Sequence, residues 1–302
     1  MRELKTKVVV MFLVLGPLIA TLYALVSLWG QLISWLDLGL LIVMYLLVGM
    51  GVTIGFHRYL AHGAFQTSNA LKVVLLVLGT MSLQGSPITW ASIHRRHHAY
   101  SDHEGDVHSP QLSKNIFLGL VHAQFGWLFG GERPNSQRWS RDLLENRCIV
   151  IVNRLSPLWM VLGLIIPLAI GGWSGLLWGG LVRLFLTHHV TWSVNSVCHL
   201  YGSRPFITKD HSTNNWLVGL LGLGEGGHNT HHASPRSARH GLYWWHFDLS
   251  WQVIRLLSRV HLIHDVYTLD PESLKLALAE KAGSIRVIIN NRLQKVRGVA
   301  SI

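Results

Sequence analysis

Two long stretches of the chain are strongly apolar and contain no basic residue. The first runs from Lys7 to Arg58 and the second from Arg154 to Arg183, with no Lys or Arg between those ends. Basic residues are spread over the rest of the chain. Uncharged apolar stretches of this length indicate helices that cross a lipid bilayer rather than the amphipathic helices of a water-soluble core.

Each stretch is long enough for two spans that form a hairpin. A helix rises about 1.5 Å per residue, so about 20 residues cross a hydrocarbon core about 30 Å thick. The first hairpin is predicted at about 8–30 and 32–56, with one acid, Asp37, in its second span. The second hairpin is predicted at about 155–171 and 175–198, with its turn in the GGWSG segment. A signal peptide is disfavoured, because a second apolar stretch follows the first one directly.

The positions of the basic residues predict the orientation in the membrane. Both predicted hairpin turns lack Lys and Arg, and the positive-inside rule then places residues 57–154 and 199–302 on the cytoplasmic face. We therefore expect an all-α, multi-pass integral membrane protein with four transmembrane helices in two hairpins. Residues 1–302 are expected to form a single domain, with both termini in the cytoplasm and a cytosolic helical cap.

Three further segments predict helices that do not span the bilayer. Residues 70–84 are apolar but short, and Lys72 near their start favours an interfacial or re-entrant helix. Residues 250–263 have apolar positions at helical spacing, which is typical of a helix on the membrane surface or on the cytoplasmic body. Residues 270–302 predict one or two basic helices, to which we assign no function.

The composition agrees with a membrane protein and excludes two other classes. Only 14% of the 302 residues are charged, whereas soluble domains have about 25%. The net charge of +11 follows from the cytoplasmic bias of Lys and Arg, so it does not indicate a nucleic-acid partner. The two cysteines, Cys148 and Cys198, form no CxxC pair, which excludes a disulfide framework and an iron–sulfur or rubredoxin site.

Three motifs, HRYLAH, HRRHH and HNTHH, concentrate the histidines of the chain. They contain eight of the 19: His57, His62, His94, His97, His98, His228, His231 and His232. In the HxxHH pattern, positions i, i+3 and i+4 share one helical face, so three imidazoles can converge from a single turn. Two such helices facing each other can ligate two metal ions. All three motifs lie on the predicted cytoplasmic side.

The HxxxxH pair and the fourth predicted span need separate treatment. Residues i and i+5 of a straight α-helix diverge by about 140°, so we expect the helix to end between His57 and His62. In the fourth span, Asn195 and His199 are four residues apart, on a face shared with His188. His199 is therefore a further candidate ligand, and His188 a weaker one.

The other histidines are expected to be ordinary hydrogen-bonded or interfacial side chains. His103 and His108 are close enough to HRRHH to orient its imidazoles. Imidazole ligands suit iron, zinc, copper or nickel, so the histidines alone do not identify the metal.

The order and spacing of these motifs resemble those of the membrane fatty acid desaturases, specifically the delta-9, stearoyl-CoA desaturase type. The resemblance covers roughly residues 35–265 and includes WASIHRRHHAYSD, TWSVNSVCHLYGSRP and GEGGHNTHH. It implies that nine histidines, the eight above and His199, bind two iron ions (Fe²⁺). It also implies that Asn195 holds a metal-bound water and that His188 is not a ligand.

The resemblance implies an oxygen-dependent reaction that introduces a cis double bond, with delta-9 position favoured, into a saturated fatty acyl chain. Unactivated C–H bonds offer no handle for acid–base chemistry, so no catalytic residue is expected beyond the metal ligands. Trp90 and Trp192 are candidate lining residues of the acyl tunnel. Glu225 and His228 form the one Glu-x-x-His pair; the resemblance favours Glu225 as a partner that orients an imidazole over a direct ligand.

The expected partners follow from the resemblance and from the segments in which this chain departs from the family pattern. The chain contains no HPGG segment of a fused cytochrome b5 domain, so we expect a separate electron donor, such as a ferredoxin or rubredoxin with its reductase, besides O₂. Animal acyl-CoA members carry a basic cluster for the CoA phosphates after the GW dipeptide, where this chain reads GWLFGGERPNSQR. Acyl-CoA is the favoured substrate, and an acyl-lipid is the alternative.

Three other functions remain as alternatives at this point. A fatty acyl hydroxylase on the same scaffold shares the first hydrogen abstraction. A zinc transporter is disfavoured, because its ligands are expected near the bilayer midplane rather than outside the spans. A non-catalytic relic is disfavoured as well, because no histidine of the three motifs is missing.

Overall fold

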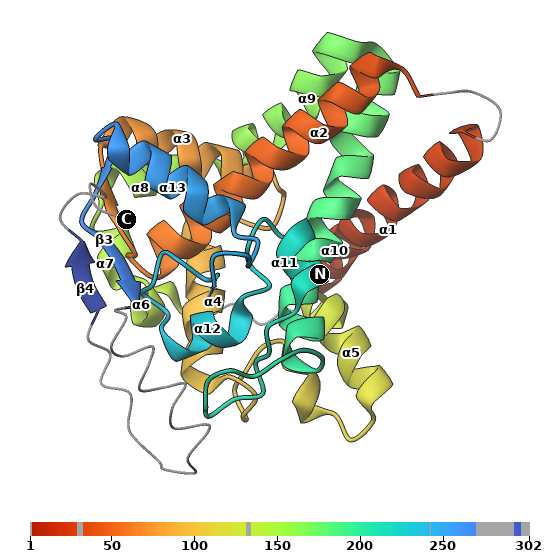
Figure 1. Ribbon diagram of the computed structural model, residues 1–302. Helices are drawn as coiled ribbons and strands as arrows, with labels where there is room; N and C mark the ends of the chain where they lie inside the picture. Colours follow the sequence, from red (N-terminus) through yellow and green to blue (C-terminus); the bar gives the residue numbers. More distant parts are fainter. Residues whose placement is uncertain (1, 29–32, 131–133, 242, 270–292, 297–302) are drawn as a thin grey trace.

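The computed structural model describes residues 2–28, 33–130, 134–241, 243–269 and 293–296, and the chain is mostly helical (Figure 1). The α-helices are α1 (Arg2–Leu28), α2 (Trp35–Met50), α3 (Asn69–Thr80), α4 (Pro87–Tyr100), α5 (Ile116–Gln124), α6 (Ser136–Trp139), α7 (Arg141–Leu144), α8 (Arg147–Arg154), α9 (Ser156–Gly175), α10 (Arg183–Ser196), α11 (Trp216–Leu221), α12 (His228–Ala233) and α13 (Leu249–Arg259). Two π-helices, η1 (Gly51–Ala61) and η4 (Leu176–Val182), and three 3₁₀-helices, η2 (Pro110–Leu112), η3 (Gly126–Gly130) and η5 (Val197–His199), complete the helical elements of the described residues.

Three helical segments of the described chain are long and apolar enough to cross a membrane. They are Thr6–Ser27, Trp35–Ala61 and Ser156–His199. The third has 44 residues and is broken at Gly172, whose φ of 61° and ψ of −148° lie outside the helical region. Glycine adopts such a conformation at little cost, which explains why the break falls within GGWSG. Beyond it, the chain folds back until Gly179 packs against Pro167.

The second long segment extends beyond the predicted span and ends, as predicted, between His57 and His62. Its helix does not stop at residue 56 but continues through η1 to Ala61. Two glycines let η1 lie directly on α3: a Cβ on Gly51 would lie 2.1 Å from the backbone N of Gly79, and one on Gly55 would lie 2.8 Å from the carbonyl O of Leu75. The two backbones are therefore in contact, and η1 is held in place by α3.

The shorter segments pack on the body of the molecule. The apolar stretch predicted at 70–84 forms α3, whose 12 residues begin after the capping hydroxyl of Ser68. The stretch predicted at 250–263 forms α13, which buries Ile254 in a core with Ile54, Phe65 and Leu75. This core connects α13, η1 and α3. Figure 1 shows α13 beside α3.

The chain is not all-α as expected, because the described residues include two small antiparallel sheets. Strand β1 (Gln66–Thr67) pairs with β2 (Ile263–His264), and β3 (Val266–Leu269) pairs with β4 (Leu293–Val296). Strands of two to four residues are too short to show a period-2 pattern, so hydrophobic periodicity does not reveal them. Strand β4 lies in the segment predicted to be helical; residues 270–292 and 297–302 lie outside the described residues, and basic helices there stay a prediction.

Candidate metal centre

The HxxxxH pair is brought together by the π-helix η1. The backbone N–H of His62 donates to the carbonyl of His57 at 3.2 Å, which is an i→i+5 hydrogen bond. Because such a bond stacks residue i+5 over residue i, the two imidazoles face the same way, and their ring centroids are 5.0 Å apart. The helix ends at Ala61, and the divergence calculated for an α-helix does not arise.

HRRHH and HNTHH each lie on a helix, and His199 lies at the end of the long apolar segment Ser156–His199. HRRHH lies on α4, which begins with Pro87 at its first turn, where a proline removes no needed hydrogen bond. HNTHH forms the six-residue helix α12, and His199 ends η5 directly after α10. His97, His199 and His231 are fully buried.

The nine histidines form two groups, and in each the candidate ligand atoms lie within 4.8 Å of one another. The first group contains His57, His62, His94, His98 and His231, and the second contains His97, His199, His228 and His232. Each HxxHH motif is therefore divided between the groups instead of converging on one point. Positions i+3 and i+4 differ by about 100° around a helix, so neighbouring imidazoles face different sites.

The ring nitrogens are arranged as a cation would require. The Nε2 atoms of His62 and His94 lie 2.7 Å apart, and those of His199 and His228 lie 2.9 Å apart. Among the described residues, the buried Nε2 atoms of His97 and His232 have no hydrogen-bond partner. Lone pairs this close are stabilised by a shared positive charge, and an all-imidazole set fits iron and other transition metals.

The protonation states of these imidazoles favour metal binding. Burial, followed by the neighbouring histidines, holds the pKa well below the ordinary value in His62, His94, His98, His228 and His231. Neutral imidazoles keep a lone pair at neutral pH, as a metal ligand must. The lowered pKa values leave four of the five imidazoles of the first group, and His228 of the second, neutral and able to bind a cation.

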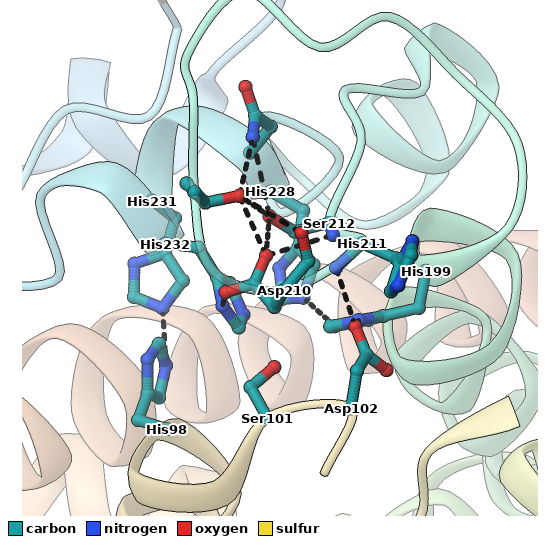
Figure 2. Close-up of polar contacts among 12 residues, drawn as sticks. His98, Ser101, Asp102, His199, Asp210, His211, Ser212, His228, His231 and His232 are labelled. Carbon is teal, nitrogen blue, oxygen red and sulfur yellow. Dashed lines mark hydrogen bonds and ion pairs between the residues drawn. The ribbon is translucent and has the colours of Figure 1, made fainter. Parts of the chain in front are cut away.

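Four carboxylates fix the orientation of imidazoles from behind. The Nδ1 atoms donate to an acid in His97 (Asp106, 3.0 Å), His199 (Asp102, 2.8 Å), His232 (Asp210, 2.8 Å) and His57 (Glu225). A proton held on Nδ1 leaves the lone pair of Nε2 facing the group. Figure 2 shows Asp210 beside His232, and Asp102 between His199 and the backbone of His211.

Sequence reasoning found one of these acids, Glu225, and missed the other three. Asp102 and Asp106 follow HRRHH within a few residues, and this proximity could have identified them as partners of its imidazoles. No comparable feature of the sequence indicates Asp210. Burial opposes ionisation of Asp102, but the hydrogen bonds from His199 and Ser109 outweigh it and lower its pKa to about 2. The carboxylate is therefore charged and able to hold its imidazole.

Glu225 pairs with a buried cation, Arg58, which also contacts two further acceptors. The side chain of Arg58 is fully buried, and its Nη2 lies 3.0 Å from Asp248 and 3.3 Å from Oε1 of Glu225. The same nitrogen is 3.1 Å from Nδ1 of His240, a histidine to which the sequence assigned no role. His57, Glu225 and His240 form a further cluster of metal-ligand type, but the guanidinium of Arg58 disfavours a cation there.

The histidines predicted to orient HRRHH differ in position. His103 is exposed, and its Nδ1 donates to the carbonyl of Ser101. His108 is buried, and its ring centroid lies 4.5 Å from that of His97. Only His108 therefore contacts a histidine of the two groups.

A cavity of about 690 Å³ reaches both histidine groups. Its wall includes His57 and His94 from the first group and His228 from the second. Trp90, Trp192 and Asn195 line the same cavity, and so does His188. The Trp90 ring stacks on His94 and the Trp192 ring on His188, with centroids 5.1 and 4.9 Å apart. Nε2 of His188 donates to the carbonyl of Ser82, and His188 belongs to neither group.

Comparisons with known proteins show the family of the chain. The family model described as fatty acid desaturase matches residues 33–268. The chain is 42% identical to the hex-5-enoyl-[acyl-carrier protein] acetylenase of Moorena producens (strain JHB), over 88% of this chain and 87% of that protein. It is 37% identical to the sn-1 stearoyl-lipid 9-desaturase of Synechocystis sp. (86% and 80%) and to the acyl-CoA C20 Delta5-desaturase of Anemone leveillei (77% and 74%).

These relatives differ, by name, in acyl carrier and in the position of the bond they modify. The comparisons therefore do not single out the delta-9 acyl-CoA type among desaturases. The family match covers the second and third long apolar segments, Trp35–Ala61 and Ser156–His199, and all three histidine motifs. The chain belongs to the fatty acid desaturase family and is a fatty acyl desaturase.

Proposed function

We propose that this enzyme uses O₂ and two iron ions to introduce a cis double bond at carbon 9 of a saturated fatty acyl chain. The observation that carries the proposal is the cavity, which joins residues of the long apolar helices, such as Val10 and Val52, to both histidine groups. An acyl chain in this cavity brings its methylenes to the imidazoles. The surface of its wall is mostly apolar, which favours an acyl chain over water.

The nine histidines of the two groups would hold the iron ions. When bound, iron supplies the oxidising power by which one O₂, two donor electrons and two protons convert two adjacent methylenes to a double bond, with two waters released. The side chains orient and position: the four carboxylates fix their imidazoles, and Trp90 and Trp192 hold the acyl chain. We place Asn195 as the residue that holds a metal-bound water, since it lines the cavity with His228.

We extend the proposal to four membrane spans in a single domain. A helix of 44 residues would be about 66 Å long, roughly twice the hydrocarbon thickness, so Ser156–His199 fits two crossings joined at Gly172. The Lys and Arg distribution then favours a cytoplasmic position for the termini and the metal centre. The electron donor is a separate protein, such as a ferredoxin or rubredoxin with its reductase.

A product analysis in cells tests the reaction and its position. The protein is expressed with a compatible ferredoxin system, the cells are pulsed with labelled stearate, and the acyl-CoA and lipid pools are followed over time. A double bond at carbon 9 supports the proposal, and the pool in which it appears first identifies the acyl carrier. The His97→Ala variant is expected to abolish the product without loss of folded protein; unchanged product formation would refute the site assignment.

The same analysis separates two related oxygenase activities. One relative of this chain is named an acetylenase, which favours further dehydrogenation of an existing double bond as the second candidate. Labelled oleate supplied in place of stearate tests it, and a triple bond in the product would establish this activity. A hydroxylated product would instead show the hydroxylase that shares the same first hydrogen abstraction.

A further inference from the structure

Helix α11 exposes an apolar face that no described element covers. Trp216 is 79% exposed, and Leu217, Leu220 and Leu221 are exposed beside it. The opposite face is anchored, because Val218 is buried in a core with Val194 and Cys198 at the end of α10. The helix is therefore fixed to a long apolar helix by one face while the other is free.

An exposed aromatic loop lies next to α11. Trp244 is 88% exposed, and Tyr243, Trp245 and Phe247 are exposed around it. The backbone of Gly219 in α11 packs near the carbonyl of Phe247. We call the exposed side chains of α11 and of this loop the aromatic patch; it contains Trp216, Leu217, Leu220, Leu221, Tyr243, Trp244, Trp245 and Phe247.

The segments that form the aromatic patch contain no Asp, Glu, Lys or Arg. None occurs in residues 211–224 or 241–247. Scattered exposed apolar residues are ordinary on a protein surface, but a contiguous patch with three tryptophans marks an interaction surface. Trp and Tyr concentrate where a protein meets the interface of a bilayer, since their rings are apolar and their edges donate hydrogen bonds.

The aromatic patch is continuous with the wall of the cavity and with α2. Tyr45 of α2 donates a hydrogen bond from its hydroxyl to the carbonyl of Leu221 at 2.7 Å. Leu221 lines the cavity although it is 47% exposed, and so does Val9 of α1, which is 57% exposed. The cavity wall therefore includes exposed residues of α1 and α11, and Tyr45 of α2 lines the cavity as well. Figure 1 shows α11 where the apolar helices meet the rest of the molecule.

We propose that the aromatic patch is immersed in one leaflet of the bilayer and that the cavity opens laterally beside it, so that the acyl chain of a membrane lipid enters from the hydrocarbon. This inference rests on the proposed function and names its substrate as a lipid-borne acyl chain. A soluble carrier with phosphates would need basic groups at the opening; residues 211–224 and 241–247 offer none, and in α1 Lys7 is the basic residue that lies in sequence between the lining residues Thr6 and Val9. A lipid ester needs only the apolar wall that is present.

Spin labels test the immersion without any activity measurement. Single cysteines replace Leu220 and Trp244 in a Cys148→Ser background, and the labelled protein is placed in phosphatidylcholine and phosphatidylglycerol nanodiscs. Both labels are expected to collide more with O₂ than with a water-soluble nickel chelate, as lipid-immersed sites do. A label at Lys209→Cys, on an exposed polar loop, is the matched control. If the labels at positions 220 and 244 collide with the nickel chelate as often as the label at position 209, the proposal is overturned.

Narrowing the opening tests the lateral route. The Val9→Trp variant is expected to desaturate stearoyl lipid in nanodiscs at least tenfold more slowly than wild type. Phe12→Trp is the control, because Phe12 is 74% exposed on the same helix and does not line the cavity. Equal rates for Val9→Trp and wild type on stearoyl lipid would refute lateral entry. If wild type converts no acyl substrate at all, the proposed function is wrong, and the spin labels alone decide the immersion.

Discussion

At the scale of single residues, the hydrogen-bond partner of Nδ1 decides which ring nitrogen of an imidazole can bind a metal. Four imidazoles donate Nδ1–H to Asp102, Asp106, Asp210 or Glu225. A carboxylate at Nδ1 fixes the tautomer and makes Nε2 a better donor to a metal. The acids are thus as much a part of the centre as the histidines.

Removal of one such acid is expected to weaken metal binding. Asp210→Ala leaves His232 in place but deprives its Nδ1 of the acceptor at 2.8 Å. Loss of such a partner typically lowers metal affinity about 10–100-fold. Iron content by elemental analysis during a chelator titration measures this directly. Glu145→Ala, which removes an exposed partner of Arg141, is the control and is expected to bind iron like wild type.

Trp192 is expected to influence which acyl chains are accepted. Its buried ring stacks on His188 and lines the cavity, so Trp192→Ala enlarges the space for the chain. One methylene in an apolar pocket is worth about 1–3 kcal/mol of discrimination, so the ratio of products from stearate and longer chains is expected to shift by about tenfold or more. Gas chromatography of the products after a mixed feed measures the ratio. An unchanged ratio would contradict a lining role.

At the scale of elements, the π-helix η1 decides whether HxxxxH can work as a pair. Its i→i+5 bond places His62 over His57, and its glycines let it lie against α3. π-Helical turns are rare and are frequently found at functional sites. Here the function of the turn is geometric, because an α-helix of the same sequence would direct the two imidazoles apart.

A methyl group at the contact of η1 and α3 is expected to disturb the first histidine group. A Cβ on Gly51 would lie 2.1 Å from the backbone N of Gly79, which cannot move as a side chain does. Overpacking of this kind typically costs about 1–3 kcal/mol, so Gly51→Ala is expected to lower both the melting temperature and the iron content. Gly39→Ala, where no atom lies within 4 Å of the added methyl, is expected to leave both unchanged or slightly raise stability. Equal behaviour of the two variants would argue against the close packing.

At the scale of the whole molecule, the two histidine groups cross-link segments that are distant in sequence. The contact between His57 and His231 spans 174 residues, and that between His98 and His231 spans 133. Without a cation, the buried lone pairs face one another, which destabilises the folded chain. A metal that binds only the folded state therefore stabilises the whole cap by mass action.

Metal removal is expected to lower the stability of the protein. When free iron is about 100 times its Kd, binding contributes about 2.7 kcal/mol, and chelation removes this contribution. The melting temperature in detergent, with and without chelator and after iron is restored, measures the difference. In His97→Ala the shift on chelation is expected to be smaller than in wild type, because the second group has lost a ligand. A melting temperature that is independent of chelator would contradict the metal centre.

The sequence alone determined the parts of this protein that depend on residue type and local period. The apolar helices follow from the absence of charge, because a charge in hydrocarbon is costly whatever the fold, and the histidine candidates follow from their spacing. The break falls within GGWSG as predicted, and the nine candidate histidines lie in two groups; that they bind metal stays a prediction. Sequence also identified Glu225 as a partner of an imidazole.

Tertiary structure decided what depends on contacts between distant segments. The division of each HxxHH motif, the π-helical turn and the two small sheets arise from backbones that pack together, as η1 packs on α3. Glu225 lies 168 residues from His57, and Asp102 lies 97 residues from His199. Local periodicity contains no information about such pairs, because their distance is fixed by the packing of whole helices and not by the position of either residue within its own helix.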